Sequence, residues 1–461
     1  MIYDPGSYRD PAGRVVIQDS RVYRAIFEAG REPFEAAVSA GVYDRLIGKS
    51  QLVGMETTDP AVLGDIGQTP CHVVEHPRLD FVSYPYEWCF SALKQAALLH
   101  LDFHLSLLTD GFTLSDATAY NIQFNGTAPV FIDHLSIIPY REGQPWAGQR
   151  QFASQFLNPL LLWAKKGIAP NAWFRGSLEG IPSEDLLALL SWRDKMSFTV
   201  MAHVVAPAKL QQRAIRNSAD DASPSTPKPL ARKGLEGILM GLRDFIAGLS
   251  IPAADTVWGD YDHNNSYDLA KREAKHAFVG RMVQKCQPQQ LFDIGCNSGD
   301  YTQTALDHGA ANVVGFDFDF GALEHAFARF SKSGAPVLPL WLDATNPSPA
   351  QGWASAERKS LGQRADADAM IALAFIHHLA IARNIPLDMA VDWLVSLAPT
   401  GIIEFPNKED AMVRKLLSTR EDIFPDYTEE AFLAHLGARA RIVESERIDG
   451  SNRILVHYDR S

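Results

Sequence analysis

The chain has 461 residues, of which 46% are hydrophobic and 21% are charged, and its formal net charge is -12. This length suits two or three domains, and the composition is that of a folded globular protein, which excludes global disorder. The negative charge argues against nucleic acid as a partner, because binding to phosphates needs positive charge.

The cysteine pattern and the apolar runs bear on the compartment. Cys71, Cys89, Cys286 and Cys296 form no CxxC pair and no metal-ligand spacing, so we expect a reducing compartment and no metal site. The first residues, MIYDPGSYRDPAGR, lack the apolar core of a signal peptide. No run of roughly 18 apolar residues is present, so we expect a cytoplasmic protein without a membrane span. The oligomeric state is not predicted.

One stretch of the N-terminal region, LSDATAYNIQFNGTAPVFIDHLS at 114–136, carries a spacing typical of catalytic loops. Asn121 follows Asp116 by five residues, and Asp133 follows after an apolar run. This spacing resembles that of protein-kinase-like and aminoglycoside-phosphotransferase-like folds, which implies one base and two metal ligands at these positions. A plain hairpin around NGT is the simpler interpretation.

The same region departs from the kinase-like pattern in three ways. Leu114 and Ser115 precede Asp116 where those folds have His-x, no glycine-rich loop is present, and VYRAI offers only Arg24 for the strand lysine. We therefore expect residues 1–215 to form an accessory α+β domain. It is either a degenerate kinase-like fold or a domain that binds substrate or a partner.

The stretch RNSADDASPSTPKPLARK, at 216–233, is rich in Ser, Pro, Asp and Ala and contains no aromatic residue. Such a composition buries too little apolar surface to offset the entropy of ordering, so we expect a linker. A second domain is then expected at 234–461.

Short apolar runs alternate with helical patterns in the C-terminal region, which predicts an α/β fold with a Rossmann-like, doubly wound parallel sheet. Its ligand would bind at the carboxyl ends of the strands. Near the end of the chain, ARIVESERI and RILVHYDR are separated by DGSN, which predicts an antiparallel strand pair at the edge of the sheet. The five runs expected as parallel strands are QQLFDIG, ANVVGFD, PVLPLWLD, ADAMIALAF and GIIEFP.

The turn after the first of these strands, LFDIGCNSGDYTQ at 291–303, indicates the class of ligand. It has no P-loop lysine, and Asn297 and Asp300 stand where a dinucleotide fingerprint needs its second and third glycines. Asp293, just before the turn, would oppose a pyrophosphate but suits a ligand with an ammonium and a sulfonium. The turn therefore favours S-adenosylmethionine over NAD.

Acids at the next two strand ends support this interpretation. Asp317 ends VVGFD, where a carboxylate can accept hydrogen bonds from ribose hydroxyls, and Asp319 could share that role. Asp343 ends PVLPLWLD and could accept from an adenine amino group. The alternative is that each acid only caps the following helix.

Together these features resemble the class I S-adenosylmethionine-dependent methyltransferases over residues 256–461. The resemblance implies that the methionine end lies along the glycine turn, the ribose at Asp317, and the adenine at Asp343 and Ala344. The stretches HHLAIARNIPL, IIEFPNKEDAMV and REDIFPDY further resemble a bacterial group related to the nodulation protein NoeA. The cofactor-binding set that we expect is Asp293, Gly295, Cys296, Asn297, Gly299, Asp317, Phe318, Asp343, Ala344 and Ala374.

Catalytic candidates follow the fourth and fifth strands. His377 and His378 come directly after AMIALAFI and could act as a base, although alignment alone suffices in many methyltransferases. Glu404, in GIIEFP, could orient the acceptor or cap the chain. The alternative for the histidines is that one packs and the other faces solvent.

Two further segments could contribute to the site. In WGDYDHNNSYDLAKREAKHAFV, at 258–279, Trp258, Tyr261 and Tyr267 could form a lid, or pack on the sheet. REDIFPDY, at 420–427, lies where substrate-selecting insertions are common.

The function expected from the sequence is methyl transfer from S-adenosylmethionine to an unidentified acceptor, with an oxygen or nitrogen nucleophile favoured. Two alternatives stay open. One is a non-catalytic binding or regulatory protein with the same fold, and the other is a bifunctional protein with an N-terminal ATP site.

Overall fold

The structure is a computed structural model that describes residues 3–209, 229–251 and 266–460. The chain divides into two compact units. Unit 1 is drawn from Met1–Phe124, Ala128–Ala254 and Ala350–Arg358. Unit 2 is drawn from Asn125–Thr127, Asp255–Pro349 and Lys359–Ser461.

Unit 1 has mixed α and β structure, as expected for an α+β domain. Its larger sheet is antiparallel with the order β1-β2-β4-β3, and β5–β8 and β6–β7 form two further pairs. The NGT turn joins β6 to β7, so the expected hairpin is confirmed. The strands are β1 (Gly13–Gln18), β2 (Arg21–Ile26), β3 (Glu56–Thr58), β4 (His72–His76), β5 (Phe112–Leu114), β6 (Ile122–Asn125), β7 (Ala128–Phe131) and β8 (Ile137–Pro139).

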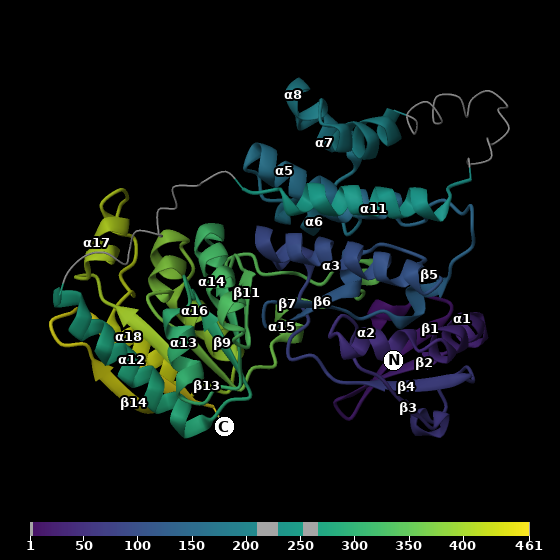
Figure 1. Ribbon diagram of the computed structural model, residues 1–461. Coiled ribbons are helices and arrows are strands. Elements are labelled where there is room, and N and C mark those ends of the chain that lie inside the picture. The colour runs from purple at the N-terminus through teal and green to yellow at the C-terminus, as the bar shows by residue number, and fades with distance from the viewer. Residues whose placement is uncertain (1–2, 210–228, 252–265, 461) are drawn as a thin grey trace. The chain divides into compact units, whose positions relative to one another are not determined.

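The remaining regular structure of unit 1 is helical (Figure 1). The longest of these that the structure describes are α3 (Phe90–Thr109) and α11 (Arg232–Ala247). The others are α1 (Glu28–Ser39), α2 (Val42–Gly48), α4 (Gln149–Phe152), α5 (Asn158–Lys166), α6 (Asn171–Gly176), α7 (Ser183–Leu189), α8 (Trp192–Lys195) and α9 (Phe198–Val200).

Helix α11 changes the expected domain boundary. It packs against α3, where the Arg243 guanidinium pairs with Asp102 and the Lys94 ammonium donates to the carbonyls of Ala247 and Leu249 at 2.7 and 2.8 Å. Its Leu239 is fully buried. The second domain was expected to begin at 234, but this helix belongs to unit 1. Of the expected linker, residues 216–228 lie outside the described part of the chain.

Unit 2 contains the predicted seven-stranded sheet, with the order β11-β10-β9-β12-β13-β15-β14. The first five strands are parallel, and β15 runs antiparallel between β13 and β14. All five predicted parallel strands and the terminal pair are therefore confirmed. The strands are β9 (Gln290–Ile294), β10 (Asn312–Asp317), β11 (Val337–Trp341), β12 (Ala369–Ala372), β13 (Thr400–Pro406), β14 (Arg441–Arg447) and β15 (Arg453–Asp459).

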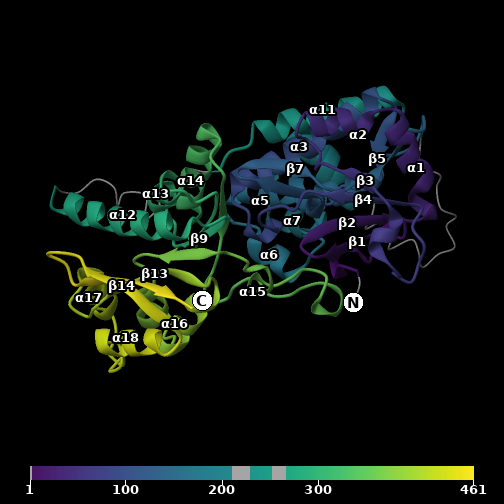
Figure 2. The same cartoon turned by 90° about the horizontal axis from the view of Figure 1, so that it is seen from below.

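Helices cover both faces of this sheet, which makes unit 2 a doubly wound α/β fold. Figure 2 shows α12, α13 and α14 on one face and α16 and α18 on the other. The central strands are buried throughout, because both of their faces are covered. The helices are α12 (Ser266–Cys286), α13 (Asp300–Asp307), α14 (Phe320–Ser333), α15 (Leu361–Arg364), α16 (Leu387–Ser396), α17 (Ala411–Leu417) and α18 (Glu429–Gly437).

Within the described ranges, we find no helix with both the length and the apolar character that a bilayer crossing requires.

Candidate functional site

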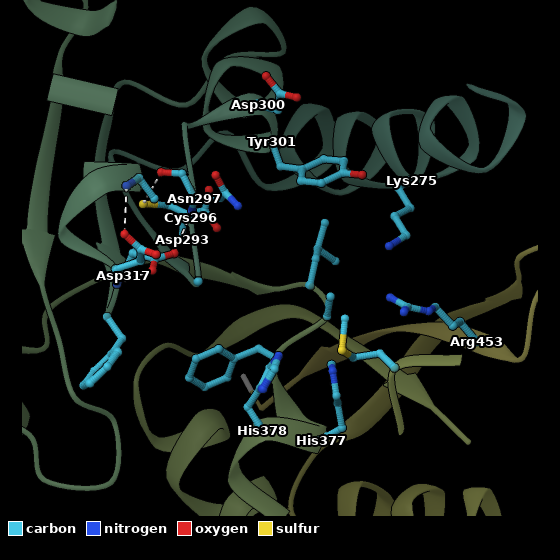
Figure 3. A pocket seen from close by; sticks show the side chains of 18 of the residues that line it. Lys275, Asp293, Cys296, Asn297, Asp300, Tyr301, Asp317, His377, His378 and Arg453 are labelled. Carbon is cyan, nitrogen blue, oxygen red and sulfur yellow. Dashed lines mark hydrogen bonds between the residues drawn. The ribbon is translucent and has the colours of Figure 1, made fainter. Parts of the chain in front are cut away.

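A cavity of about 1220 Å³ lies at the carboxyl ends of the parallel strands of unit 2. Such edges are where open α/β sheets bind ligands, because the connecting loops diverge there. Nine of the ten residues of the expected cofactor set line this cavity, all but Gly299, and so do His377 and His378. Figure 3 shows the acids on one side of the cavity and the two histidines across from them.

The glycine turn between β9 and α13 adopts backbone conformations that explain its sequence. Gly295, Asn297 and Gly299 have positive φ angles of 84°, 49° and 89°, a region that glycine enters freely and asparagine tolerates. A Cβ on Gly299 would meet the Phe330 ring at 2.4 Å. The turn is fixed to β10 because the N–H groups of Gly295 and Cys296 both donate to the carbonyl of Phe316.

Asp293 lies within β9 and is almost completely buried. The Thr302 hydroxyl donates to its carboxylate at 2.6 Å. Burial disfavours the charged form and raises the pKa of Asp293 to about 7, more than this hydrogen bond lowers it. A cationic ligand group beside it would favour ionisation.

Asp317 ends β10 and faces the glycine turn. One of its oxygens accepts from the N–H of Asn297 and the other from the N–H of Asp319, each at 2.8 Å. Burial still raises the pKa of Asp317. Asp319 instead caps α14 by accepting from the N–H groups of Gly321 and Ala322. Of the two acids proposed for a ribose, only Asp317 is thus free of a capping role.

Asp343 follows β11 and holds its own turn, since it accepts from the N–H and the hydroxyl of Thr345. Both the ligand-binding and the capping interpretations therefore fit this acid. Phe318 is 56% exposed, and its ring lies 5.9 Å from the Trp341 ring. Exposed Phe318, beside half-buried Trp341, offers a surface on which a planar base can stack.

His377 and His378 lie side by side, with ring centroids 4.2 Å apart. His377 is 1% exposed, and neither ring nitrogen has a hydrogen-bond partner among the described residues. Burial, with the charges of His378, Arg453 and Lys275, lowers the pKa of His377 to about 2. Burial also lowers the pKa of His378. The His377 imidazole is therefore neutral at physiological pH.

Glu404 is completely buried in β13 and lies behind the cavity wall rather than on it. Its oxygens accept from the Lys275 ammonium at 2.7 and 2.9 Å, from Arg453 at 3.2 Å and from the N–H of Ala374 at 2.6 Å. Burial alone would raise the pKa of Glu404, but the charges of Lys275 and Arg453 outweigh it and lower the pKa. This geometry suits a positioning residue, whereas the sequence pointed to a catalytic one.

Lys275 and Arg453 line the cavity and were not identified from the sequence. Lys275 comes from α12, within the segment where only a lid of aromatic residues was considered. Arg453 begins β15, and an antiparallel strand begins at the edge where its parallel neighbours end. The predicted antiparallel direction of the last strand could therefore have placed Arg453 at the ligand-binding edge of the sheet.

The two remaining candidate segments do not add to the site. Trp258 and Tyr261 lie outside the described residues, and the side chain of Tyr267 is not described. None of residues 420–427, all of which the structure describes, lines the cavity. Instead, the Tyr427 hydroxyl donates to the carbonyl of Pro406 at 2.8 Å.

In unit 1 the structure brings Asp116 and Asn121 together, since the Asn121 amide donates to the Asp116 carboxylate at 3.1 Å. Burial, and then the charge of Asp133, raise the pKa of Asp116 to about 7. Asp133 is already paired with Arg24 at 2.9 Å. Among the residues that the structure describes, no three acidic, histidine or cysteine side chains gather as a metal site.

Comparisons with known proteins give one relative with whole-chain similarity. Nodulation protein NoeA of Rhizobium meliloti (strain 1021) is 44% identical over 457 residues, which is 99% of this chain and 96% of that protein. No family model matches the chain.

Similar solved structures cover less of the chain. N-methyltransferase NodS of Bradyrhizobium japonicum WM9 is 15% identical, covers 42% of this chain and 97% of its own, and has a TM-score of 0.30. Magnesium protoporphyrin IX methyltransferase of Synechocystis PCC 6803 is 17% identical, covers 43% of this chain and 86% of its own, and has a TM-score of 0.29.

Proposed function

The chain belongs to the family of nodulation protein NoeA, and we propose that it transfers a methyl group from S-adenosylmethionine to an acceptor with an oxygen or nitrogen nucleophile. The observation that carries this proposal is that three acids, from β9, from β10 and from the segment after β11, line one cavity beside the glycine turn. They are Asp293, Asp317 and Asp343.

The residues present fit such a donor. S-adenosylmethionine supplies a methyl group activated by the sulfonium to which it is bound. Asp293 offers negative charge for the cationic methionine end, and the glycine turn lets the backbone approach it. The Asp317 carboxylate uses two of its four lone-pair sites on backbone N–H groups, which leaves two for ribose hydroxyls. Asp343 and Ala344 would lie beside the adenine, and Phe318 and Trp341 would cover a planar face.

The contribution of the chain to the chemical step would be alignment rather than strong base catalysis. His377 is buried and neutral, and a base with so low a pKa gains little by taking a proton near pH 7. It can still accept a hydrogen bond from an acceptor hydroxyl or amine and so hold its orientation. Alignment of reacting groups alone can supply a large part of the rate enhancement.

Unit 1 would bind the acceptor or a partner. Its residues Trp192, Met196 and Phe198 lie close together in sequence and are 67%, 70% and 86% exposed. Exposed apolar side chains of this size are typical of contact surfaces. A bifunctional protein with an ATP site in unit 1 is the second candidate, because Asp116 and Asn121 adjoin and the pKa of Asp116 is raised.

The experiment that tests the proposal uses the full chain and donor labelled in its methyl group. The protein is incubated with fractions of a cell extract, and the labelled product is identified by mass spectrometry. The Asp317→Ala variant serves as a control with impaired donor binding. Donor binding without any labelled product would favour the non-catalytic alternative, and a lack of donor binding would overturn the proposal.

A further inference from the structure

The cavity of unit 2 has two chemically different sides. Acids from the ends of three parallel strands line one side, and they are the residues proposed for the donor. Two of the cations that line the cavity are Lys275, from α12, and Arg453, at the start of β15. Figure 3 shows Lys275 and Arg453 pointing toward the same part of the cavity, with Tyr301 and His377 near them.

Glu404 holds Lys275 and Arg453 together. Both cations bond to the same oxygen of Glu404, at 2.7 Å from the Lys275 nitrogen and 3.2 Å from the Arg453 nitrogen. Arg453 also pairs with Asp410 through two nitrogens, at 2.7 and 3.1 Å. A buried carboxylate that fixes two cations side by side prepares them for a shared ligand.

The charges in this cluster balance, but its accessible surface is mainly cationic. The side chains of Lys275 and Arg453 are 13% and 19% exposed, whereas those of Glu404 and Asp410 are 0% and 9% exposed. An ammonium has three N–H donors and a guanidinium has five. The contacts above use two donors of Lys275 and three of Arg453, so each cation retains donors for a ligand.

An independent observation points to a ligand at the same place. His377 lines the cavity, is 99% buried, and has no hydrogen-bond partner for either ring nitrogen among the described residues. Buried polar atoms are nearly always satisfied in native proteins, and an exception calls for a missing partner. Lys275 and Arg453 lie near enough to act on this ring electrostatically.

We infer that Lys275 and Arg453 form an anion-binding subsite, and that the methyl acceptor carries a carboxylate or phosphate group which binds there. This inference rests on the proposed methyl transfer and narrows its substrate to an anionic class. The anionic group receives N–H donors from Lys275 and Arg453, and His377 offers one ring donor and one ring acceptor to a neighbouring hydroxyl or amine of the same molecule. Charge-assisted hydrogen bonds of this kind are about twice as strong as neutral ones.

The test measures anion binding to the full chain, with and without S-adenosylhomocysteine. Benzoate is the carboxylate probe, benzyl alcohol is its neutral counterpart, and inorganic phosphate is the competitor; ligand-observed NMR gives their dissociation constants. The variants are Lys275→Met, which removes a cavity cation, and Lys275→Arg, which keeps the charge. Arg281→Met is the matched control, because Arg281 lies on the same helix but pairs with Glu444 and Glu446 on the surface.

We expect benzoate to bind more tightly than benzyl alcohol and phosphate to displace it. Lys275→Met should weaken benzoate binding by roughly tenfold, the loss expected for one charge-assisted hydrogen bond. Lys275→Arg should stay within about twofold of the wild type, because it keeps the positive charge. Arg281→Met should also stay within about twofold, because surface ion pairs such as those of Arg281 contribute little. Phosphate binding tighter than benzoate would indicate a phosphorylated acceptor, and the reverse a carboxylic acid.

Equal binding of benzoate and benzyl alcohol, or unchanged benzoate binding in Lys275→Met, would overturn the subsite. Calorimetry with S-adenosylhomocysteine tests the donor separately. Absence of donor binding, together with benzoate binding that depends on Lys275, would leave the anion site standing and remove the methyl-transfer function.

Discussion

The backbone N–H of Asn297 donates a hydrogen bond to the Asp317 carboxylate at 2.8 Å. This bond joins the turn after β9 to the end of β10, so the two parts of the proposed donor site depend on one another. Asn297 has a φ of 49°, a conformation in which the side chain of asparagine is tolerated better than most. The carboxylate of Asp317 therefore orders the turn and is also the expected partner of the donor.

Replacement of Asp317 by alanine should weaken donor binding by tenfold or more, with roughly 1–3 kcal/mol lost from the free energy of unfolding. The reason is that two backbone N–H groups lose their acceptor while they stay partly buried. Calorimetric titration with S-adenosylhomocysteine and denaturant unfolding measure the two effects. Asp307→Ala, which removes an exposed acid that accepts a hydrogen bond from Gln303 on the same helix, is the control and should change neither. Unchanged affinity in Asp317→Ala would contradict the assignment.

Donor affinity should rise with pH up to about pH 7. The pKa of buried Asp293 is raised to about 7, and a cationic donor favours its ionised form. Donor affinity is then at its maximum above this pKa and falls as the pH decreases through it. The reason is that the protonated Asp293 of the free protein must release its proton on binding. Calorimetry at pH 6 in buffers of different ionisation enthalpy should detect that proton, and Asp293→Asn should abolish it.

The same carboxyl group bears on stability with the opposite sign. A raised pKa in the folded state means that its contribution to stability is fully present below the unfolded value of about 4 and is lost as the pH rises toward 7. The free energy of unfolding of Asp293→Asn, minus that of the wild type, should therefore be more positive at pH 8 than at pH 4. A stability difference that does not vary across this interval would contradict the raised pKa.

Replacement of His377 by leucine should leave stability unchanged or increase it by about 1 kcal/mol, while methyl transfer falls. Neither ring nitrogen is bonded within the described protein, so an apolar side chain of similar size loses nothing in the empty state. His457→Leu is the contrasting variant, because the His457 ring is hydrogen bonded to Thr400 at 3.0 Å. It should destabilise the protein by about 1 kcal/mol. Full transfer activity in His377→Leu would show that this ring does not serve the acceptor.

In unit 1 we expect Mg-ATP to give no thermal stabilisation. The Asp133 carboxylate is already engaged by Arg24 and by the N–H of Leu135, so a metal would have to displace a partly buried ion pair. Thermal-shift measurements on the wild type and on Asp133→Ala decide the matter. A shift with Mg-ATP in the wild type that disappears in Asp133→Ala would support the bifunctional alternative.

The fold of unit 2 could be predicted from sequence because its parallel strands are short apolar runs, most of which end at an acid, a glycine or a proline. The acids in these runs also indicated the part of the cavity where we propose that the donor binds. The order of the last three strands could not be read in the same way. Both members of a hairpin satisfy the local pattern, and only packing determines that β15, rather than β14, pairs with β13.

The cationic side of the cavity was missed for a physical reason. Lys275 belongs to a helix that precedes the first strand, where sequence gives no strand end to mark the ligand-facing edge. The position of Glu404 in β13 singled it out in the sequence, but the partners of its carboxylate could not be predicted. The sequence does not tell whether a buried carboxylate contacts a ligand or two cations. Helix α11 follows a polar stretch, and composition alone assigned it to the C-terminal domain, whereas the structure groups it with unit 1.

Leu239→Ala should distinguish the two assignments of α11. Leu239 is fully buried in unit 1, so its truncation should cost about 2–5 kcal/mol in the unfolding of that unit. Met240→Ala, at a position that is 53% exposed, should change stability by less than about 0.5 kcal/mol. S-adenosylhomocysteine binds unit 2 in our proposal, so it should raise the midpoint of the unfolding transition of unit 2 and leave that of unit 1 unchanged. If Leu239→Ala instead destabilises the transition whose midpoint S-adenosylhomocysteine raises, α11 belongs to unit 2.

The buried carboxylate of Glu404 also has a consequence for ionic strength. Cations on an open surface are screened at physiological salt over about 8 Å, and they attract any anion that passes. Lys275 and Arg453 are instead held against an internal counter-charge that salt does not reach, and their side chains are only 13% and 19% exposed. The affinity of this pair for an anion should therefore change little with salt concentration. It should depend more on where the anionic group lies in the ligand than on the charge of the ligand alone.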